Sequence, residues 1–222
     1  MWVVLTFVPG RYTPRMTTTF HFVRHGSTTA NERGIFMGML DVPLSRTGLE
    51  QAQALREAIQ HVHFDAVYCS PLMRAYHTAL ISLGWAEASA SDGDSYRLTL
   101  WPRAEREHRA ELIVDMRLAE RSFGDLQGEP KEGYLQRFSK YAQRKVTMSF
   151  DDKADGGESF ADLELRMANF IRDANERHAG ETLLVFSHNG PIRIAAKLLL
   201  GLSEEETLAR SNPHCELITF SK

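Results

Sequence analysis

Two short stretches of the chain place a histidine at the end of an apolar run. The first stretch, residues 20–31, changes from apolar residues to the pair Arg24-His25 and then to glycine and small hydroxyl residues. The second stretch, residues 183–190, changes in the same way at His188. A neutral imidazole is a nucleophile, and a neighbouring arginine disfavours its protonation and can bind a phosphate or carboxylate through two hydrogen bonds. These residue types indicate chemistry on an oxyanion.

Two further residues suit the same chemistry. Arg74 lies near the start of a predicted helix, where the helix dipole favours an anion. Glu120 lies at the edge of a Gly-rich loop, a usual place for a general acid. Each residue has a simpler explanation by itself: a surface ion pair for the arginine and a solvated turn for the glutamate. Two histidines at strand ends together with two arginines at loop edges are harder to explain by chance.

The elements that must position these residues alternate along the chain. Short buried strands are predicted at residues 20–24, 64–69, 96–101, 183–186 and 215–220. Helices are predicted after the N-cap Ser45, from Ser70-Pro71 to about residue 83, at 103–111, at 133–145, after the Ser159–Asp162 capping box, and from Pro191 to about residue 200. Residues 87–94 and 120–131 are predicted to be loops.

This alternation predicts an α/β fold, a three-layer sandwich with a mostly parallel central sheet flanked by helices. Neighbouring strands of such a sheet end at the same edge, so His25 and His188 can face one another across one site. The length of 222 residues allows one domain with a large core. We assign that single domain to residues 18–222 and treat residues 1–17 as an extension ahead of it.

The composition limits the classes of binding partner and the cellular compartment that we expect. The net charge of −3 provides no general attraction to nucleic acid or to an anionic membrane, so a phosphate site must be a local basic pocket. No apolar run approaches the roughly 20 residues of a membrane span. The two cysteines, Cys69 and Cys215, form neither a disulfide framework nor a zinc site, which suits a reducing cytoplasm. We therefore expect a cytoplasmic protein with a small phosphorylated substrate as its partner, and leave its oligomeric state open.

From Phe20 onward the sequence resembles the histidine phosphatase superfamily, which includes cofactor-dependent phosphoglycerate mutases. The matching motifs follow one another in order through nearly the whole chain: Arg24-His25-Gly26 with Thr28 and Asn31; Gly38, Asp41, Pro43-Leu44-Ser45 and Gly48; Ser70-Pro71, Arg74-Ala75 and Thr78-Ala79; Leu118, Glu120, Phe123-Gly124 and Gly128; Gly157-Glu158-Ser159; and Ser187-His188 with Gly190 and Ile192-Arg193. Any one of these motifs is weak, but the ordered series is specific. The resemblance implies a phosphoglycerate mutase-like fold.

The resemblance also implies roles for five catalytic residues. His25 would be the nucleophile that attacks phosphorus and becomes a phosphohistidine. Arg24, Arg74 and His188 would hold the non-bridging oxygens and stabilise the charge of the transition state. Glu120 would protonate the leaving oxygen and then deprotonate the water that hydrolyses the phosphoenzyme.

Further candidates for binding the phosphate or the rest of the substrate follow from the same resemblance: Thr28, Asn31, Gly38, Asn189, Arg121 and Lys131. Thr28 and Asn31 would add donors to the phosphoryl group, and Asn189 stands where the family usually has glycine. We expect no metal site, because fixed cations would do the work of a metal. We also expect no cofactor, except 2,3-bisphosphoglycerate if the protein is a mutase.

Three functions remain open at this point. The leading interpretation is a phosphomonoester hydrolase acting on a small phosphorylated metabolite. The alternative is a cofactor-dependent phosphoglycerate mutase: Arg121 and Lys131 suit it, but Phe123 replaces its usual tyrosine and its pair of adjacent arginines is missing. The third is a catalytically silent member that binds phosphorylated ligands or a protein. Residues 84–118 are longer than in compact members, and we expect this segment to face the substrate.

Overall fold

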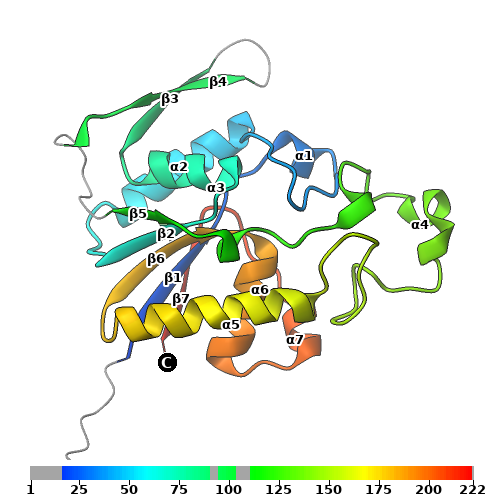
Figure 1. The fold of residues 1–222 in the computed structure, drawn as a ribbon. Coiled ribbons are helices and arrows are strands. Elements are labelled where there is room, and N and C mark those ends of the chain that lie inside the picture. Colours follow the sequence, from blue (N-terminus) through cyan, green and yellow to red (C-terminus); the bar gives the residue numbers. More distant parts are fainter. Residues whose placement is uncertain (1–16, 91–94, 104–110, 222) are drawn as a thin grey trace, which may run out of the picture.

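The fold is built on a five-stranded sheet in which one edge strand runs against the others. The computed structural model describes residues 17–90, 95–103 and 111–221 (Figure 1). The strand order is β5-β2-β6-β1-β7, and β7 alone is antiparallel to its neighbour β1. The strands span β1 Thr19–Arg24, β2 Ala66–Cys69, β5 Leu112–Val114, β6 Thr182–Ser187 and β7 Leu217–Ser221. The predicted mostly parallel sheet is therefore confirmed.

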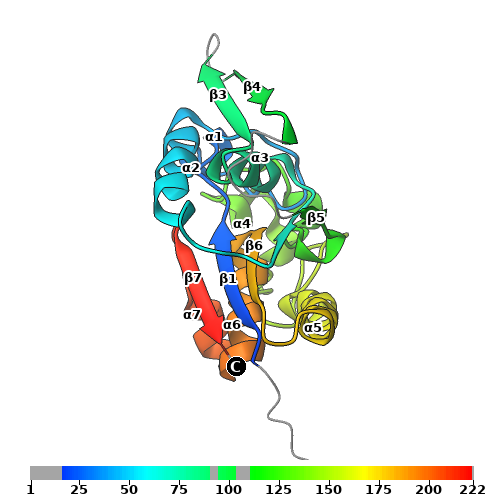
Figure 2. The same cartoon turned by 90° about the vertical axis from the view of Figure 1, so that its left-hand side faces the viewer.

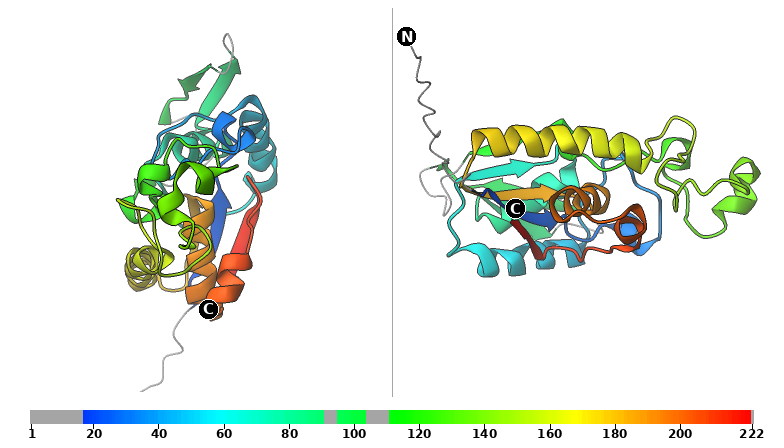
Figure 3. Two further views of the ribbon diagram at one scale, coloured as in Figure 1. Left: turned by 90° about the vertical axis from the view of Figure 1, so that its right-hand side faces the viewer. Right: turned by 90° about the horizontal axis from the view of Figure 1, so that it is seen from below.

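Helices cover both faces of this sheet, so the molecule has three layers (Figures 2 and 3). On β6, Leu183 and Val185 pack with α5 and α6, whereas Leu184 and Phe186 pack on the opposite face with α2 and α3. Burial on both faces explains why the strand reads as one continuous apolar run. The helices that form the two outer layers are α2 Arg46–Ile59 and α3 Met73–Ser82 on one side, and α5 Phe160–Arg177 and α6 Asn189–Leu200 on the other.

The remaining elements are short and lie around the ends of the sheet. They are α1 Thr29–Glu32, α4 Tyr134–Arg137 and α7 Glu204–Ala209, with short 3-10 helices at Met116–Leu118, Gly124–Leu126 and Ser139–Tyr141. A separate hairpin, β3 Ala86–Ala90 with β4 Tyr96–Leu100, lies beside α2 and α3 and outside the main sheet (Figure 1). None of the helices within the described ranges combines the length and the apolar composition that crossing a bilayer requires.

Two predicted helix starts are confirmed because they depend on local hydrogen bonds. Ser45 is the N-cap of α2 and accepts a hydrogen bond from the backbone N–H of Gly48. Ser159 caps α5, and the capping box with Asp162 is complete in both directions. Pro191 does not open its helix, however, because α6 already begins at Asn189 with His188 in the N-cap position.

Other local predictions are wrong. Ser70 does not cap α3, which begins at Met73 with Leu72 as its N-cap. The loop predicted at 87–94 contains β3, whose backbone pairs with β4. The helix predicted over 133–145 is only one turn of α-helix, because Phe138 leaves helical geometry with φ −117° and ψ 66°. Residues 1–16 and most of the predicted helix at 103–111 lie outside the described ranges.

Candidate active site

The two histidines meet where β1 and β6 end side by side. Arg24 on β1 is in register with Ser187 on β6, so the next residues, His25 and His188, leave the sheet together. Their ring centroids are 5.1 Å apart, and both side chains are buried. The predicted juxtaposition of the two imidazoles is therefore a property of the parallel register.

Hydrogen bonding selects the reactive nitrogen of His25. Its Nδ1 lies 2.7 Å from the carbonyl oxygen of Gly26, and a carbonyl can only accept, so Nδ1 carries the proton. The lone pair is then on Nε2, which is free to attack. Burial holds the pKa of His25 well below 6.5, and the charges of Arg74 and Arg24 lower it further. The imidazole is thus kept neutral and nucleophilic.

His188 differs from His25 in which ring nitrogen has a partner. Its Nε2 lies 2.7 Å from the hydroxyl of Ser70, which itself accepts from the backbone N–H of Leu72. The Ser70 proton is therefore available to Nε2, which leaves a proton on the buried Nδ1. That Nδ1 has no hydrogen-bond partner. Burial, followed by the charge of Arg74, keeps the pKa of His188 well below its usual value. His188 is a neutral donor.

Two arginines flank the histidines. Arg74 is completely buried, and its terminal nitrogens donate to the carbonyls of Leu40 (2.7 Å) and Gly38 (2.8 Å). Burial lowers its pKa to about 10, so it remains a cation at neutral pH. Arg24 donates from one terminal nitrogen to the carbonyl of Asn212 at 2.7 Å. Both guanidinium groups are thus anchored by neutral carbonyl oxygens, and the Glu120 carboxylate offsets part of their charge.

Unpartnered N–H groups are concentrated in this site. Among the described residues, four buried side-chain nitrogens lack a hydrogen-bond partner: Nε of Arg24, Arg74 and Arg193, and Nδ1 of His188. A buried donor without a partner is costly, and each such group requires an explanation. Three of these four nitrogens belong to residues that surround His25. A ligand rich in acceptor oxygens and negatively charged would satisfy them.

Glu120 lies against the first turn of α6, next to His188. One carboxylate oxygen accepts from the backbone N–H of Arg121 (2.8 Å) and the other from that of Gly190 (3.4 Å). A Cβ at Gly190 would lie 2.3 Å from Glu120 Oε1, so the glycine provides the space for the carboxylate. The Glu120 charge raises the pKa of Arg24, opposing the larger effect of burial, which places this carboxylate in the same electrostatic cluster.

Four of the candidate phosphate-binding residues also make hydrogen bonds within the fold. The hydroxyl of Thr28 accepts from the N–H of Asn31, and the Asn31 amide oxygen accepts from Thr28, which forms the capping box of α1. Gly38 contributes its carbonyl to Arg74 and adopts a left-handed φ of 51°. The Asn189 amide oxygen accepts two hydrogen bonds from Asn212. These four residues therefore support the site through its scaffold.

The two basic candidates from the Glu120 loop, Arg121 and Lys131, lie in different surroundings. Arg121 is buried between the rings of Phe123 and Phe160, at 4.6 and 4.4 Å, and donates to the carbonyls of Val146 and Glu158. Its guanidinium is committed to packing, so the prediction that Arg121 binds substrate does not match these contacts. Lys131 is exposed at the rim of the site. Desolvation and then the charge of Arg24 lower its pKa, which places it within electrostatic reach of the site.

Sequence reasoning missed a segment, residues 212–215, that holds the Arg24-His25 dipeptide. His214 donates from Nδ1 to the carbonyl of His25 at 2.5 Å, and its ring lies edge-on to that of His25 with centroids 5.3 Å apart. The backbone N–H of Cys215 donates to the carbonyl of Arg24, with Cys215 at a left-handed φ of 52°. Burial lowers the pKa of His214 to about 4, so this third imidazole is also neutral. Nothing in local sequence marks it, because its contacts depend on the pairing of β7 with β1.

Comparison with known proteins decides the family. The sequence model of the histidine phosphatase superfamily (branch 1) matches residues 20–94 and 97–221. The chain belongs to the histidine phosphatase superfamily. Among its relatives in this superfamily, it is 31% identical over 180 residues to phosphoserine phosphatase 1 of Hydrogenobacter thermophilus, covering 81% of this chain and 75% of that protein.

Relatives within the histidine phosphatase superfamily include both phosphatases and mutases. The 2,3-bisphosphoglycerate-dependent phosphoglycerate mutase of Chlamydia pneumoniae is 28% identical over 200 residues, covering 86% of this chain and 88% of that protein. The crystal structure of the alpha-ribazole phosphatase from Shigella flexneri superimposes with a TM-score of 0.73 at 25% identity, covering 91% of this chain and 93% of that one. Membership in the superfamily therefore supports an enzyme acting on phosphorylated compounds. The reaction is either hydrolysis, as in the phosphatases, or phosphoryl transfer between hydroxyls, as in the mutases.

Proposed function

We propose that this chain is a phosphomonoester hydrolase that acts through a phosphohistidine on a small phosphorylated metabolite. The observation that carries the proposal is the set of partnerless N–H groups on Arg24, Arg74 and His188 around an imidazole with a free Nε2. These donors match the non-bridging oxygens of a phosphoryl group in number and charge. Named phosphatases among its relatives are consistent with the same reaction.

In the first half of the reaction, His25 Nε2 attacks phosphorus while the ester P–O bond breaks. The electron pair of that bond leaves with the alcohol oxygen, which takes a proton from the Glu120 carboxyl. The proton of His25 stays on Nδ1, hydrogen-bonded to the Gly26 carbonyl, throughout, so the imidazole is activated without losing a proton. Arg24 and Arg74 offset the negative charge on the three equatorial oxygens. The products are a free alcohol and a phosphohistidine.

In the second half, water attacks the phosphorus and the P–N bond to His25 breaks. Glu120, now a carboxylate, removes the proton from that water and returns to its acid form. Inorganic phosphate leaves, and the imidazole is regenerated as the neutral tautomer. The position of Glu120 beside the first turn of α6, next to His188, supports its use in both halves.

A mutase is the second candidate, and Lys131 is the feature that favours it. An exposed ammonium at the rim could hold the second anionic group of a phosphoglycerate while the phosphoryl group passes between two hydroxyls. The sidechain of Arg121, which would be expected to assist, is instead buried against Phe123 and Phe160. We therefore rank hydrolysis first. In the mutase, 2,3-bisphosphoglycerate would be required to load His25.

The test is a panel of phosphorylated metabolites, with release of phosphate compared with interconversion of 2- and 3-phosphoglycerate. Hydrolysis predicts that phosphate release far exceeds interconversion for at least one metabolite. His25→Ala should abolish that turnover, and trapping with labelled substrate should place an acid-labile phosphate on His25 of the wild-type protein. Interconversion that outpaces phosphate release would replace the hydrolase by the mutase, and substantial activity of His25→Ala would remove the nucleophile assignment.

We also propose that the reaction needs no metal, because Arg24 and Arg74 supply fixed positive charge. Full activity is expected after exhaustive treatment with EDTA, measured with the best substrate of the panel. Loss of activity that magnesium or zinc restores would contradict this.

The proposed location is the cytoplasm, since both cysteines are free and buried. The net charge of −3 argues against nucleic acid or an anionic membrane as a partner.

A further inference from the structure

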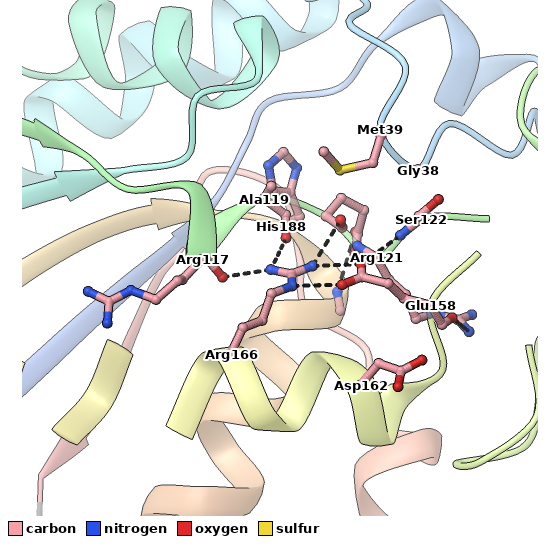
Figure 4. A network of polar contacts seen from close by, with 12 residues as sticks. Gly38, Met39, Arg117, Ala119, Arg121, Ser122, Glu158, Asp162, Arg166 and His188 are labelled. Carbon is pink, nitrogen blue, oxygen red and sulfur yellow. Dashed lines mark hydrogen bonds and ion pairs between the residues drawn. The ribbon is translucent and has the colours of Figure 1, made fainter. Parts of the chain in front are cut away.

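One arginine on α5 binds the backbone of the segment that carries Glu120. Arg166 donates to the carbonyl oxygens of Arg117 (2.6 Å), Ala119 (2.7 Å) and Glu120 (3.1 Å). Three carbonyls within four consecutive residues thus converge on a single guanidinium. Figure 4 shows Arg166 pointing from the helix toward this backbone, with His188 on the far side of the segment.

Glu158 binds both Arg166 and the backbone of the segment that carries Glu120. Its carboxylate accepts twice from Arg166, from Nε and from a terminal nitrogen, each at 3.0 Å. The same carboxylate accepts from the backbone N–H of Ser122 at 3.0 Å. Although burial opposes it, the hydrogen bond from Arg166 holds the pKa of the Glu158 carboxyl below its usual range. The pair remains ionised, and both side chains are mostly buried, with 19% and 28% exposed.

The segment of residues 117–122 is therefore held on both sides of Glu120. By contrast, the carboxylate of Glu120 has only two backbone donors, and one of them is at 3.4 Å. The location of this carboxylate is consequently set by its backbone more than by its own contacts. Proton transfer to a leaving oxygen requires hydrogen-bond distance, so a small displacement of the backbone is sufficient to slow it.

We propose that Arg166, fixed by Glu158, is a positioning residue that sets the reach of Glu120 to the leaving oxygen of the substrate. This inference rests on the proposed function, in which Glu120 is the general acid. Arg166 itself donates to backbone carbonyls and to Glu158, so it acts through the segment and not on the phosphoryl group.

A comparison of kcat for two phosphate esters with different leaving groups tests the proposal. A para-nitrophenyl leaving group departs as a stable anion and needs little protonation, whereas an alkyl leaving group such as that of glycerol phosphate needs the full proton. Arg166→Met should therefore lower kcat for the alkyl ester on the order of 10²-fold and that for the aryl ester only about threefold. Glu158→Gln keeps the shape of the pair but removes its charge, and should show the same selectivity with a smaller loss.

Two controls separate positioning from general damage. Arg172→Met removes an arginine from the exposed side of the same helix, where it pairs with Asp173, and should leave both rates unchanged. In the double variant Arg166→Met/Glu120→Gln, the alkyl rate should equal that of Glu120→Gln alone, because the positioning residue has nothing left to position. Equal losses for the two esters, or additive losses in the double variant, would overturn the inference.

Failure of the proposed function gives a different result. Wild-type protein that releases phosphate from no compound of the panel, these two esters included, refutes the hydrolase, and the inference is then decided by amide hydrogen exchange. Arg166→Met should accelerate exchange at Arg121 and Ser122, whose N–H groups donate to Glu120 and Glu158, and leave His25 protected. If Arg166→Met does not fold, Glu158→Gln is measured in the same two assays. Unchanged exchange at both amides would overturn the positioning role.

Discussion

The surroundings of His25 keep its imidazole neutral and so leave it able to act as a nucleophile. Burial removes the water that would stabilise an imidazolium, and two guanidinium groups disfavour a third positive charge nearby. The carbonyl of Gly26 then decides which nitrogen carries the single proton. The effect of Arg24 could be predicted from the Arg24-His25 dipeptide, but the larger effects could not, because Arg74 belongs to α3 and the burial comes from the whole fold.

The acid limb of the pH profile tests this arrangement. Since the pKa of His25 lies well below about 6.5, His25 is neutral above its lowered pKa, and attack is lost only as the pH falls through it. We expect the His25 imidazole, followed by NMR, to remain neutral as the pH decreases through 6.5. Arg24→Met removes one opposing charge and should raise the titration point.

Arg172→Met, on the exposed side of α5, provides the control and should leave the His25 titration unchanged. A His25 imidazole that titrates near its ordinary value in the wild-type protein would show that burial and the two arginines do not control it.

At the scale of elements, the loop after β1 is held by the first turns of two helices. The N–H of Ser45, the N-cap of α2, donates to the carbonyl of Ser27, and Gln51 accepts from the Ser27 N–H. The hydroxyl of Thr78 on α3 accepts from Gly26. The helix starts at Ser45 and Ser159 could be predicted from sequence, since a cap is a local hydrogen bond. The hairpin β3–β4 and the end of α4 could not, because their backbones follow from distant packing.

Two glycines, Gly26 and Gly48, make the contact between α2 and the loop after β1 possible. A Cβ at Gly48 would lie 2.0 Å from the carbonyl oxygen of Ser27, and backbone atoms cannot move aside as a flexible side chain can. Gly48→Ala should therefore reduce the free energy of unfolding by about 3 kcal/mol and also lower kcat, because the loop that carries His25 must shift. Chemical denaturation and the aryl phosphate assay measure the two effects.

Gly201→Ala is the matched control for Gly48→Ala. Gly201 ends α6 at a left-handed φ of 73° with nothing within 4 Å of its missing Cβ, so only backbone strain opposes the change. We expect a loss of about 1 kcal/mol and normal activity. Equal effects of the two substitutions on activity would contradict the close approach of helix and loop.

At the scale of the whole molecule, the site joins segments from nearly the full length of the chain. The parallel pairing of β1 with β6 could be predicted from their apolar runs, and with it the meeting of His25 and His188. The contribution of His214 could not, since it requires β7 to lie antiparallel beside β1. The intramolecular hydrogen bonds that Thr28 and Asn189 accept could not be predicted either, because they depend on the fold of α1 and on the position of Asn212.

The partnerless donors predict that phosphate stabilises the protein. Inorganic phosphate that binds only the folded state contributes about 2.7 kcal/mol at a concentration of 100 times its Kd, which for a chain of this size raises Tm by roughly 5–10 °C. Thermal unfolding with increasing phosphate measures this shift. His188→Ala removes one donor and should reduce the shift. An unchanged Tm at saturating phosphate in the wild-type protein would contradict an anion site at Arg24, Arg74 and His188.

The contacts of Asn212, His214 and Cys215 with Arg24 and His25 affect the order in which the site forms during biosynthesis. The Arg24-His25 dipeptide is translated long before Asn212, His214 and Cys215, which hold it. Most of α2, α3 and α5 has been synthesised well before that moment. A nascent chain therefore forms these contacts with Arg24 and His25 only after residues 212–215 have been translated, and His25 lacks their support until then.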